Sequence, residues 1–299
     1  MSVIVRNQGK SLKNEGLEVD YFMVKSGLAG YLSSIPKIRR TYKKGNYDLA
    51  HAHYSLSGFI AALARCKPLV VSLMGSDVFQ SRFIRIFIRF FYYHRWDKTI
   101  VKTNQMKARL KISKAVTIPN GVDLKTFSPI PKKDARKYLN YPECKTMILF
   151  ISGLNRHEKN LELAKAAIKA VHNDNIELRH IYNVPNNEIP YYLNSADALL
   201  LTSKWEGSVN VIKEAMACNV PIVATNVGDI EWIIGDTEGC YITSNDPNDI
   251  AEKIKAALAY GGRTEGRRRV IKLGLDSHTI AGKIIAVYRD IVHHYFVIN

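Results

Sequence analysis

Two glutamates in the second half of the chain stand where a ligand rich in hydroxyl groups could be held. Glu206 and Glu214 are separated by seven residues, and the surrounding pattern predicts a loop after a strand for the first and a helix for the second. A carboxylate accepts two hydroxyl hydrogen bonds, which suits a ribose diol or a sugar. Two ordinary surface glutamates beside a helix are the alternative, because such spacing is common.

The turn between the two glutamates is expected to open a helix. The first N–H groups of a helix have no partner within it, and together with the helix dipole they favour a phosphate. The residues of this turn and first helical turn are Gly207, Ser208, Val209 and Asn210.

Two cations follow the predicted strand 147–153. Arg156 and Lys159 lie in the sequence NRHEKN, and we expect them at the carboxyl edge of a parallel sheet. Positive charge at that edge is well placed to neutralise a departing diphosphate. A solvated basic loop is the alternative.

In the first half, His51 and His53 come at the end of a strand and point to one face. No third ligand stands at a useful spacing and the chain has no Asp-x-Asp pair, so we expect no metal site. Gly75, Ser76 and Asp77 follow the next buried strand, and Ser76 or Asp77 could cap a helix there.

The segment 81–96 combines a basic stripe with aromatic and aliphatic residues. Arg82, Arg85 and Arg89 recur at spacings of three and four residues. A basic amphipathic helix of this composition can lie in an anionic lipid interface, and an ordinary helix with solvated arginines is the alternative. The basic run Lys37, Arg39, Arg40, Lys43 and Lys44 adds positive charge to the same half.

Strands and helices alternate along the chain, which predicts parallel sheets covered on both faces. The expected strands are 19–24, 47–51, 68–75, 98–103 and 116–123, then 147–153, 176–182, 197–203, 221–226 and 239–243. The expected helices are 2–16, 55–65, 81–95 and 104–111, then 160–173, 189–196, 209–219, 231–236, 249–261 and 276–296. The basic triplet 267–269 is expected on a solvated face.

Three prolines and five lysines in residues 124–146 interrupt this alternation. We therefore predict an α/β protein of two Rossmann-like, doubly wound domains, 1–128 and 143–275, joined by a linker at 129–142. Because 2–16 is expected to be a helix, the first domain is expected to lack an opening strand with its Gly-rich loop, and such a truncation could impair activity.

The chain has 299 residues, of which 46% are hydrophobic, and a formal net charge of +16. Residues 1–140 hold 26 Lys and Arg against 8 Asp and Glu, so the first half is expected to face an anionic partner. The four cysteines lie far apart, which favours reduced thiols in a cytoplasmic protein. No apolar run reaches membrane-spanning length and no signal-peptide core is present.

The chain resembles glycosyltransferase family 4, the retaining enzymes of the GT-B fold. The resemblance is densest in residues 51–64, 68–79, 116–129, 153–160, 195–217 and 223–233. It implies two domains facing across a cleft, with the helix 276–299 returning to the first. It also implies transfer of a sugar from a UDP- or GDP-linked donor, used as a co-substrate with no resident cofactor, to a glycan or lipid-linked acceptor.

By the same resemblance, Glu214 holds the ribose hydroxyls, Glu206 contacts the transferred sugar, and the amides of Ser208, Val209 and Asn210 face the diphosphate. Lys159 and Arg156 neutralise the leaving group, although family members often place the arginine where this chain has Leu154. The acceptor side of the cleft is assigned His53, Gly75, Ser76 and Asp77, and Met74 stands where the family frequently has His.

The resemblance also fits a cytoplasmic protein held peripherally at the inner face of the membrane, with no nucleic-acid partner. Three other readings stay open. They are a catalytically impaired family member, a nucleotide-sugar 2-epimerase, and a non-catalytic protein that binds an anionic polymer through its basic half.

Overall fold

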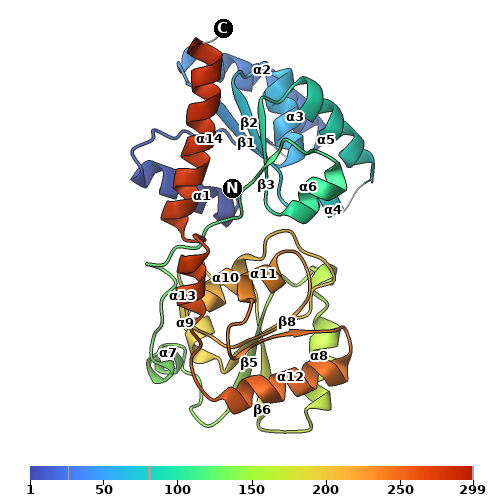
Figure 1. Cartoon of the computed structure of the whole chain (residues 1–299), viewed down its shortest axis with the longest axis vertical. Coiled ribbons are helices and arrows are strands. Elements are labelled where there is room, and N and C mark those ends of the chain that lie inside the picture. The colour runs from blue at the N-terminus through green and yellow to red at the C-terminus, as the bar shows by residue number, and fades with distance from the viewer. Residues whose placement is uncertain (26, 80–81, 298–299) are drawn as a thin grey trace. The chain divides into compact units, whose positions relative to one another are not determined.

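The structure, a computed structural model, describes residues 1–25, 27–79 and 82–297, and the chain divides into two compact units (Figure 1). Unit 1 contains Met1–Gly121 and the terminal helix from Ser277, and unit 2 contains Val122–Asp276. Each unit has one parallel sheet with helices packed on it. The predicted pair of parallel α/β sheets is therefore confirmed.

Unit 1 is built on four parallel strands in the order β1-β2-β3-β4. The strands are β1 (Ala50–His53), β2 (Leu69–Ser72), β3 (Lys98–Val101) and β4 (Val116–Thr117). The helices are α1 (Val3–Asn14), α2 (Leu28–Lys44), α3 (Ser55–Leu63), α4 (Ser76–Phe79), α5 (Arg82–His94), α6 (Asn104–Leu110) and α14 (Ser277–Val297). In Figure 1, α14 runs alongside α1, and the two helices are in contact.

The core of unit 1 follows from the apolar strand PLVVS. All four residues of β2 are buried, and the side chains of Leu69 and Val71 pack with Ile88 of α5 and Trp96. Burial on both faces explains why this strand reads as a continuous apolar run in the sequence.

Two features of unit 1 differ from the sequence-based expectation. Residues 19–24 form no strand: Tyr21, Phe22 and Met23 are exposed, and among the described residues no neighbouring strand offers the backbone partners that a strand needs. The helix α2 was not predicted, although its residues include the basic run 37–44, whose five cations are all exposed. By contrast, α1 confirms the helix expected at 2–16, with Ser2 accepting a hydrogen bond from the N–H of Val5.

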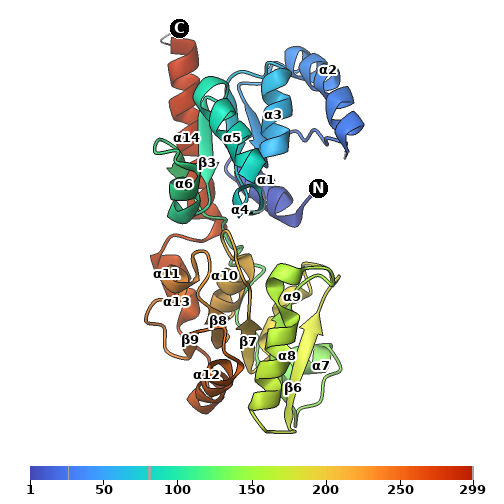
Figure 2. The ribbon, with the colours of Figure 1, turned by 90° about the vertical axis from the view of Figure 1, so that its right-hand side faces the viewer.

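Unit 2 has five parallel strands in the order β6-β5-β7-β8-β9 (Figure 2). The strands are β5 (Thr146–Ile151), β6 (Ile176–Ile181), β7 (Ala198–Leu201), β8 (Ile222–Thr225) and β9 (Cys240–Thr243). The helices are α7 (Lys132–Tyr138), the short 3-10 helix η1 (His157–Lys159), α8 (Leu161–Ala170), α9 (Ile189–Ser195), α10 (Asn210–Ala217), α11 (Ile230–Ile234), α12 (Pro247–Tyr260) and α13 (Gly266–Lys272).

The sheet of unit 2 is covered on one face by α8 and α12, whose buried side chains form a core with β5, β7 and β8. Because all five strands are parallel, their carboxyl ends meet at one edge of the sheet. The loops after β5, β7 and β8 therefore leave the sheet on the same side.

The segment expected to be a linker, 129–142, is a structured part of unit 2, which begins at Val122 and not at the expected residue 143. Arg136 of α7 is 3% exposed and donates hydrogen bonds to Ser195 O and to Asp197. Tyr138 stacks on Tyr191 of α9 with 3.9 Å between ring centroids. These long-range contacts fold a proline-rich, basic segment onto α9.

The expectation of a solvated face at 267–269 is also wrong for two of the three arginines. Arg267 donates hydrogen bonds to the carbonyl oxygens of Leu124, Phe127 and Ala217, and Arg269 donates to that of Ile233. Their guanidinium groups satisfy backbone carbonyls within unit 2.

Candidate active site

Three loops of unit 2 come together at the carboxyl edge of the sheet. Thr202, just after β7, donates a hydrogen bond to the carbonyl of Lys159 at 3.0 Å. Thr225, at the end of β8, donates to the carbonyl of Ser203 at 2.8 Å. These bonds tie the loops to each other and fix the positions of the charged side chains that they carry.

The two residues predicted to act on the sugar and on the diphosphate are in direct contact. Lys159 Nζ forms an ion pair with Glu206 Oε1, and the two side chains are 14% and 13% exposed. Ser203 Oγ donates a hydrogen bond to the same carboxylate oxygen at 2.9 Å. A largely buried cation and carboxylate held in this way form a fixed charge pair that faces little bulk water.

Arg156 lies apart from this pair. Its side chain is 54% exposed and its ion-pair partner is Glu158, two residues along the chain. Burial raises the pKa of Glu158, but the hydrogen bond and charge of Arg156 outweigh it, so the net shift of that pKa is downward. The sequence assigned Arg156 to the diphosphate together with Lys159, and the structure places only Lys159 against Glu206.

The loop 207–210 precedes α10, which begins at Asn210. Among its predicted phosphate-facing amides, that of Val209 has another partner: the N–H of Val209 donates to Asp229 Oδ1 at 3.0 Å. The assignment of the Val209 amide to a diphosphate is therefore corrected. The Asp229 carboxylate, from the loop after β8, accepts the hydrogen bond of this amide from a position twenty residues away in the sequence. Gly207 is buried, and Ser208 and Asn210 are half-buried.

Glu214 lies half-buried on α10, in the second turn of the helix. Burial raises its pKa from the usual 4.5 to about 7, against the opposing effects of the positive charges of Lys213 and Lys159. A carboxyl group with such a pKa changes protonation near neutral pH. It can accept two hydroxyl hydrogen bonds when ionised, as a ribose diol requires.

Sequence reasoning missed two charged residues of this site, Lys213 and Asp229. Lys213 is 1% exposed and donates to Ser208 Oγ at 2.6 Å. Burial lowers its pKa, opposed by the charges of Asp229 and Glu214. The signal was available: Lys213 stands four residues after Val209 and three before Met216, so a charge falls on the buried face of the helix.

In unit 1, the carboxylate of Asp77 is used by the protein itself. It is 8% exposed and accepts hydrogen bonds from Met74 N at 2.7 Å, from Ser55 N at 2.9 Å and from Ser55 Oγ at 2.7 Å. Gly75 and Ser76 lie at the start of α4, where Ser76 Oγ donates to Met74 O. Asp77 thus joins the loop after β2 to the start of α3.

His53 ends β1 and stacks on His51 with 4.4 Å between ring centroids. Its Nδ1 is buried and has no hydrogen-bond partner among the described residues. Burial, with a smaller effect of the Lys102 charge, lowers the pKa of His53 to about 3, so the ring is neutral at physiological pH. His51, by contrast, is held between Tyr288 OH and Ser72 Oγ.

The three arginines expected to face a membrane are divided by the structure. Arg82 and Arg89 are exposed on α5, whereas Arg85 is half-buried and donates to Val78 O at 3.1 Å. The outward face of α5 also carries five exposed apolar and aromatic side chains, namely Phe83, Ile86, Phe87, Phe90 and Tyr93. Within the described part of the chain, no helix has both the length and the apolar character to cross a bilayer.

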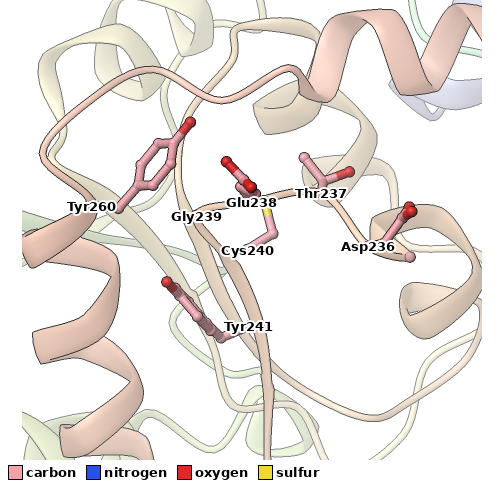
Figure 3. A pocket seen from close by; sticks show the side chains of 8 residues that line it. Asp236, Thr237, Glu238, Gly239, Cys240, Tyr241 and Tyr260 are labelled. Atoms are coloured by element: carbon pink, nitrogen blue, oxygen red, sulfur yellow. The ribbon is translucent and has the colours of Figure 1, made fainter.

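A pocket of about 380 Å³ lies elsewhere in unit 2 (Figure 3). It is lined by Asp236–Tyr241, with Gly235 and Tyr260, around the start of β9. The start of β9 is at the amino edge of the parallel sheet, opposite to the edge that carries Lys159 and Glu206. None of the predicted site residues lines it, so we assign it no part in the site.

Known structures share the fold of the chain. Sucrose-phosphate synthase from Thermosynechococcus elongatus superposes with a TM-score of 0.78 at 20% identity, covering 96% of this chain and 92% of that one. The structure of Anabaena HepE in complex with UDP superposes with a TM-score of 0.72 at 16% identity, covering 94% and 89%. The chain therefore has the GT-B fold, built from two Rossmann-like units.

Among curated proteins, the chain is 26% identical over 263 residues to an Escherichia coli enzyme, UDP-Gal:alpha-D-GlcNAc-diphosphoundecaprenol alpha-1,3-galactosyltransferase. That match covers 72% of this chain and 67% of the enzyme. It is 27% identical over 234 residues to the putative teichuronic acid biosynthesis glycosyltransferase TuaC of Bacillus subtilis, covering 69% of this chain and 60% of TuaC. The chain thus matches roughly two thirds of the length of these relatives.

Family models match both units. Residues 1–126 match the model described as Glycosyltransferase Family 4, and residues 137–274 match Glycosyl transferases group 1. Together the two models extend over most of the chain, which therefore belongs to glycosyltransferase family 4.

Proposed function

We propose that the protein is a retaining hexosyltransferase that moves a sugar from a UDP- or GDP-linked donor to a hydroxyl group of a glycan or lipid-linked acceptor. The observation that carries this proposal is the buried ion pair of Lys159 and Glu206 beside the loop 207–210. Both relatives described above bear names of glycosyltransferases, one of them acting on a diphosphoundecaprenol-linked sugar. These names, together with the family models that both units match, favour a transferase over a purely polymer-binding protein.

The proposed reaction assigns one task to each charged group. The bond between C1 of the sugar and the diphosphate breaks, and the acceptor oxygen bonds to C1 on the same face. The hydroxyl proton passes to the departing diphosphate. Lys159 stabilises the negative charge that develops on that leaving group, Glu206 contacts the sugar, and Glu214 holds the ribose diol.

A donor screen tests the proposal. Melting temperatures of the protein are compared with UDP, GDP and their sugar conjugates, and we expect one base to raise the melting temperature in both forms because ligands that bind the native state stabilise it. The variant Glu214→Ala should lose most of that increase. A parent protein that responds to neither nucleotide would contradict the proposal.

We further propose that the transfer needs no metal ion. Lys159 would then take the role of neutralising the diphosphate that a divalent cation takes elsewhere. Turnover should be unchanged after treatment with EDTA. A loss of turnover that magnesium or manganese restores would refute this part of the proposal.

We also propose that the protein works in the cytoplasm at the inner face of the membrane, bound there through α5. The exposed arginines Arg82 and Arg89 and the apolar side chains beside them support this location, since basic amphipathic helices bind anionic lipid surfaces. The protein should sediment with vesicles that contain phosphatidylglycerol and stay in the supernatant with pure phosphatidylcholine. Equal sedimentation with both would refute the electrostatic part.

A further inference from the structure

Two opposite charges are buried beneath the loop 207–210. Lys213 is 1% exposed and Asp229 is 8% exposed. Around Lys213, the side chains of Ile212, Ala215 and Met216 are all apolar and fully buried. Because taking an ammonium group out of water is costly, its presence in such surroundings needs a reason beyond packing.

Both charged groups bind the same short loop. Lys213 Nζ donates to the hydroxyl of Ser208 at 2.6 Å, and Asp229 Oδ1 accepts the N–H of Val209 at 3.0 Å. Two consecutive residues of the loop are therefore held from two directions, one by α10 and the other by the loop after β8.

The geometry of Asp229 shows that its side chain is committed to this loop. It stands at the N-cap position of α11, where an aspartate ordinarily accepts a hydrogen bond from its own helix. Here it makes no such bond and turns to Val209 instead. Beside it, Gly228 has φ +63°, and a Cβ at that position would lie 2.4 Å from Gly207 O, so the two loops are in close backbone contact.

We propose that Lys213 and Asp229 are positioning residues that hold the loop 207–210 in the conformation that receives the diphosphate of the donor. This inference rests on the proposed function. Lys213 acts through Ser208, and Asp229 acts by fixing the peptide of Val209, so that the neighbouring amide of Ser208 is directed by a fixed backbone. The cost of burying the charges is offset by a preorganised site.

A purely structural role and a positioning role give different results in three variants: Lys213→Met, Asp229→Leu and the two combined. Each single change leaves a buried charge without its counterpart and should lower the melting temperature. The combined change replaces both charges with apolar side chains, and such replacements are often neutral or stabilising, so its melting temperature should recover.

The decisive measurement is the affinity of each variant for UDP compared with uridine, and for GDP compared with guanosine. The ratio of the affinity for the nucleoside diphosphate to the affinity for the nucleoside isolates the contribution of the diphosphate. In the combined variant we expect this ratio to fall about tenfold while nucleoside binding stays at the parental level. Ser208→Ala, which removes the acceptor of Lys213 without leaving a bare carboxylate, should lower the ratio in the same direction.

Lys165→Met serves as the matched control, because Lys165 is an exposed lysine on α8 that pairs with Glu162. It should leave both the ratio and the melting temperature unchanged. A combined variant that melts like the parent and keeps the parental ratio overturns the positioning role. A parent that binds no nucleotide diphosphate overturns the proposed function as well, and that outcome is read before any variant is compared.

Discussion

At the scale of single residues, Glu214 has a protonation state that depends on conditions near neutrality. Burial raises the pKa of Glu214 to about 7, because the folded protein favours the neutral carboxyl group. The neutral form therefore stabilises the folded state at low pH, and this stabilisation is lost as the pH rises through about 7. Binding of a ribose diol has the opposite preference, since an ionised carboxylate accepts both hydroxyl hydrogens through stronger bonds.

Nucleotide affinity should therefore increase between about pH 6 and about pH 8, by roughly three- to tenfold. Isothermal titration calorimetry across this range measures it. Glu214→Gln removes the titrating group while keeping its shape, and comparison with this variant subtracts the titration of the nucleotide's own phosphates. If parent and variant show the same pH dependence, Glu214 does not hold the diol in its ionised form.

Lys159 is the residue whose loss should affect chemistry most. Lys159→Ala removes the charge that stabilises the leaving diphosphate, and turnover should fall about 100-fold or more, as for the loss of comparable groups in other enzymes. Because Glu206 also loses its ion-pair partner, the melting temperature should fall as well, so turnover is compared at a temperature well below the melting point of the variant. Steady-state kinetics with the preferred donor measures the effect, and Lys165→Ala on the surface of α8 provides the control. Parental turnover in Lys159→Ala would rule out this role.

Some residues of the candidate site could be predicted from the sequence and others could not. Lys159, Glu206 and Glu214 were singled out through the family resemblance of the segments that carry them, because the spacing of two glutamates is common on its own. The partner of the Val209 amide could not be predicted, because Asp229 reaches it only once β7 and β8 lie side by side in the sheet. Lys213 could have been found from its place on the apolar face of α10.

At the scale of elements, the loops beside the site depend on one glycine. Gly228 has a positive φ and touches the backbone of Gly207, so Gly228→Ala meets both conformational strain and a steric clash. We expect a loss of about 1–3 kcal/mol in the free energy of unfolding, together with weaker nucleotide binding. Denaturant unfolding and calorimetry measure the two effects.

The same substitution at Gly282 is the control, because Gly282 is exposed on α14 and nothing lies within 4 Å of its added Cβ. There, alanine should stabilise the helix by about 0.5–1 kcal/mol. If the two substitutions changed the free energy of unfolding equally, the close contact between the loops at Gly228 would not contribute to stability.

Two pairs of substitutions on α5 test the electrostatic and the apolar contributions to the proposed membrane binding separately. Arg82→Ser with Arg89→Ser should weaken binding to anionic vesicles by about 30-fold, from ~1 kcal/mol for each basic residue near the surface. Phe83→Ser with Ile86→Ser, which changes the two most exposed apolar side chains of the helix, should weaken binding even in high salt. Vesicle sedimentation at two salt concentrations distinguishes them.

Arg85→Ser is a useful contrast, since its guanidinium group binds Val78 O within the protein. It should change vesicle binding less than either of its neighbours does. If all of these variants sediment as the parent does, α5 is an ordinary helix of unit 1.

Elements were predicted best where burial alone decides them. β2 and β7 are buried along their whole length, and each appears in the sequence as an apolar run. Residues 19–24 form a similar run without a strand to pair with, and α7 is held by Arg136 and Tyr138 through contacts that lie more than fifty residues away. Local patterns contain neither kind of information.

At the scale of the whole molecule, the division into two units has a consequence for ligand binding. Every residue that we assign to the donor lies in unit 2, in the loops after β5 and β7 and on α10. The basic residues assigned to a membrane all lie in unit 1. Donor and membrane should therefore affect separate sets of backbone amides.

Hydrogen exchange measured by mass spectrometry tests this separation. Saturating nucleotide should slow exchange in residues 153–160 and 202–214, because at about 100 times Kd the ligand stabilises the native state by about 2.7 kcal/mol. Anionic vesicles should slow exchange in α5 and leave those two segments unchanged. At subsaturating nucleotide, Lys213→Met combined with Asp229→Leu should lose the slowing of exchange at 207–210 while keeping that near Glu214, because the loop and the ribose contact are held by different groups. Protection by nucleotide confined to unit 1 would place the donor in the other sheet and refute the site.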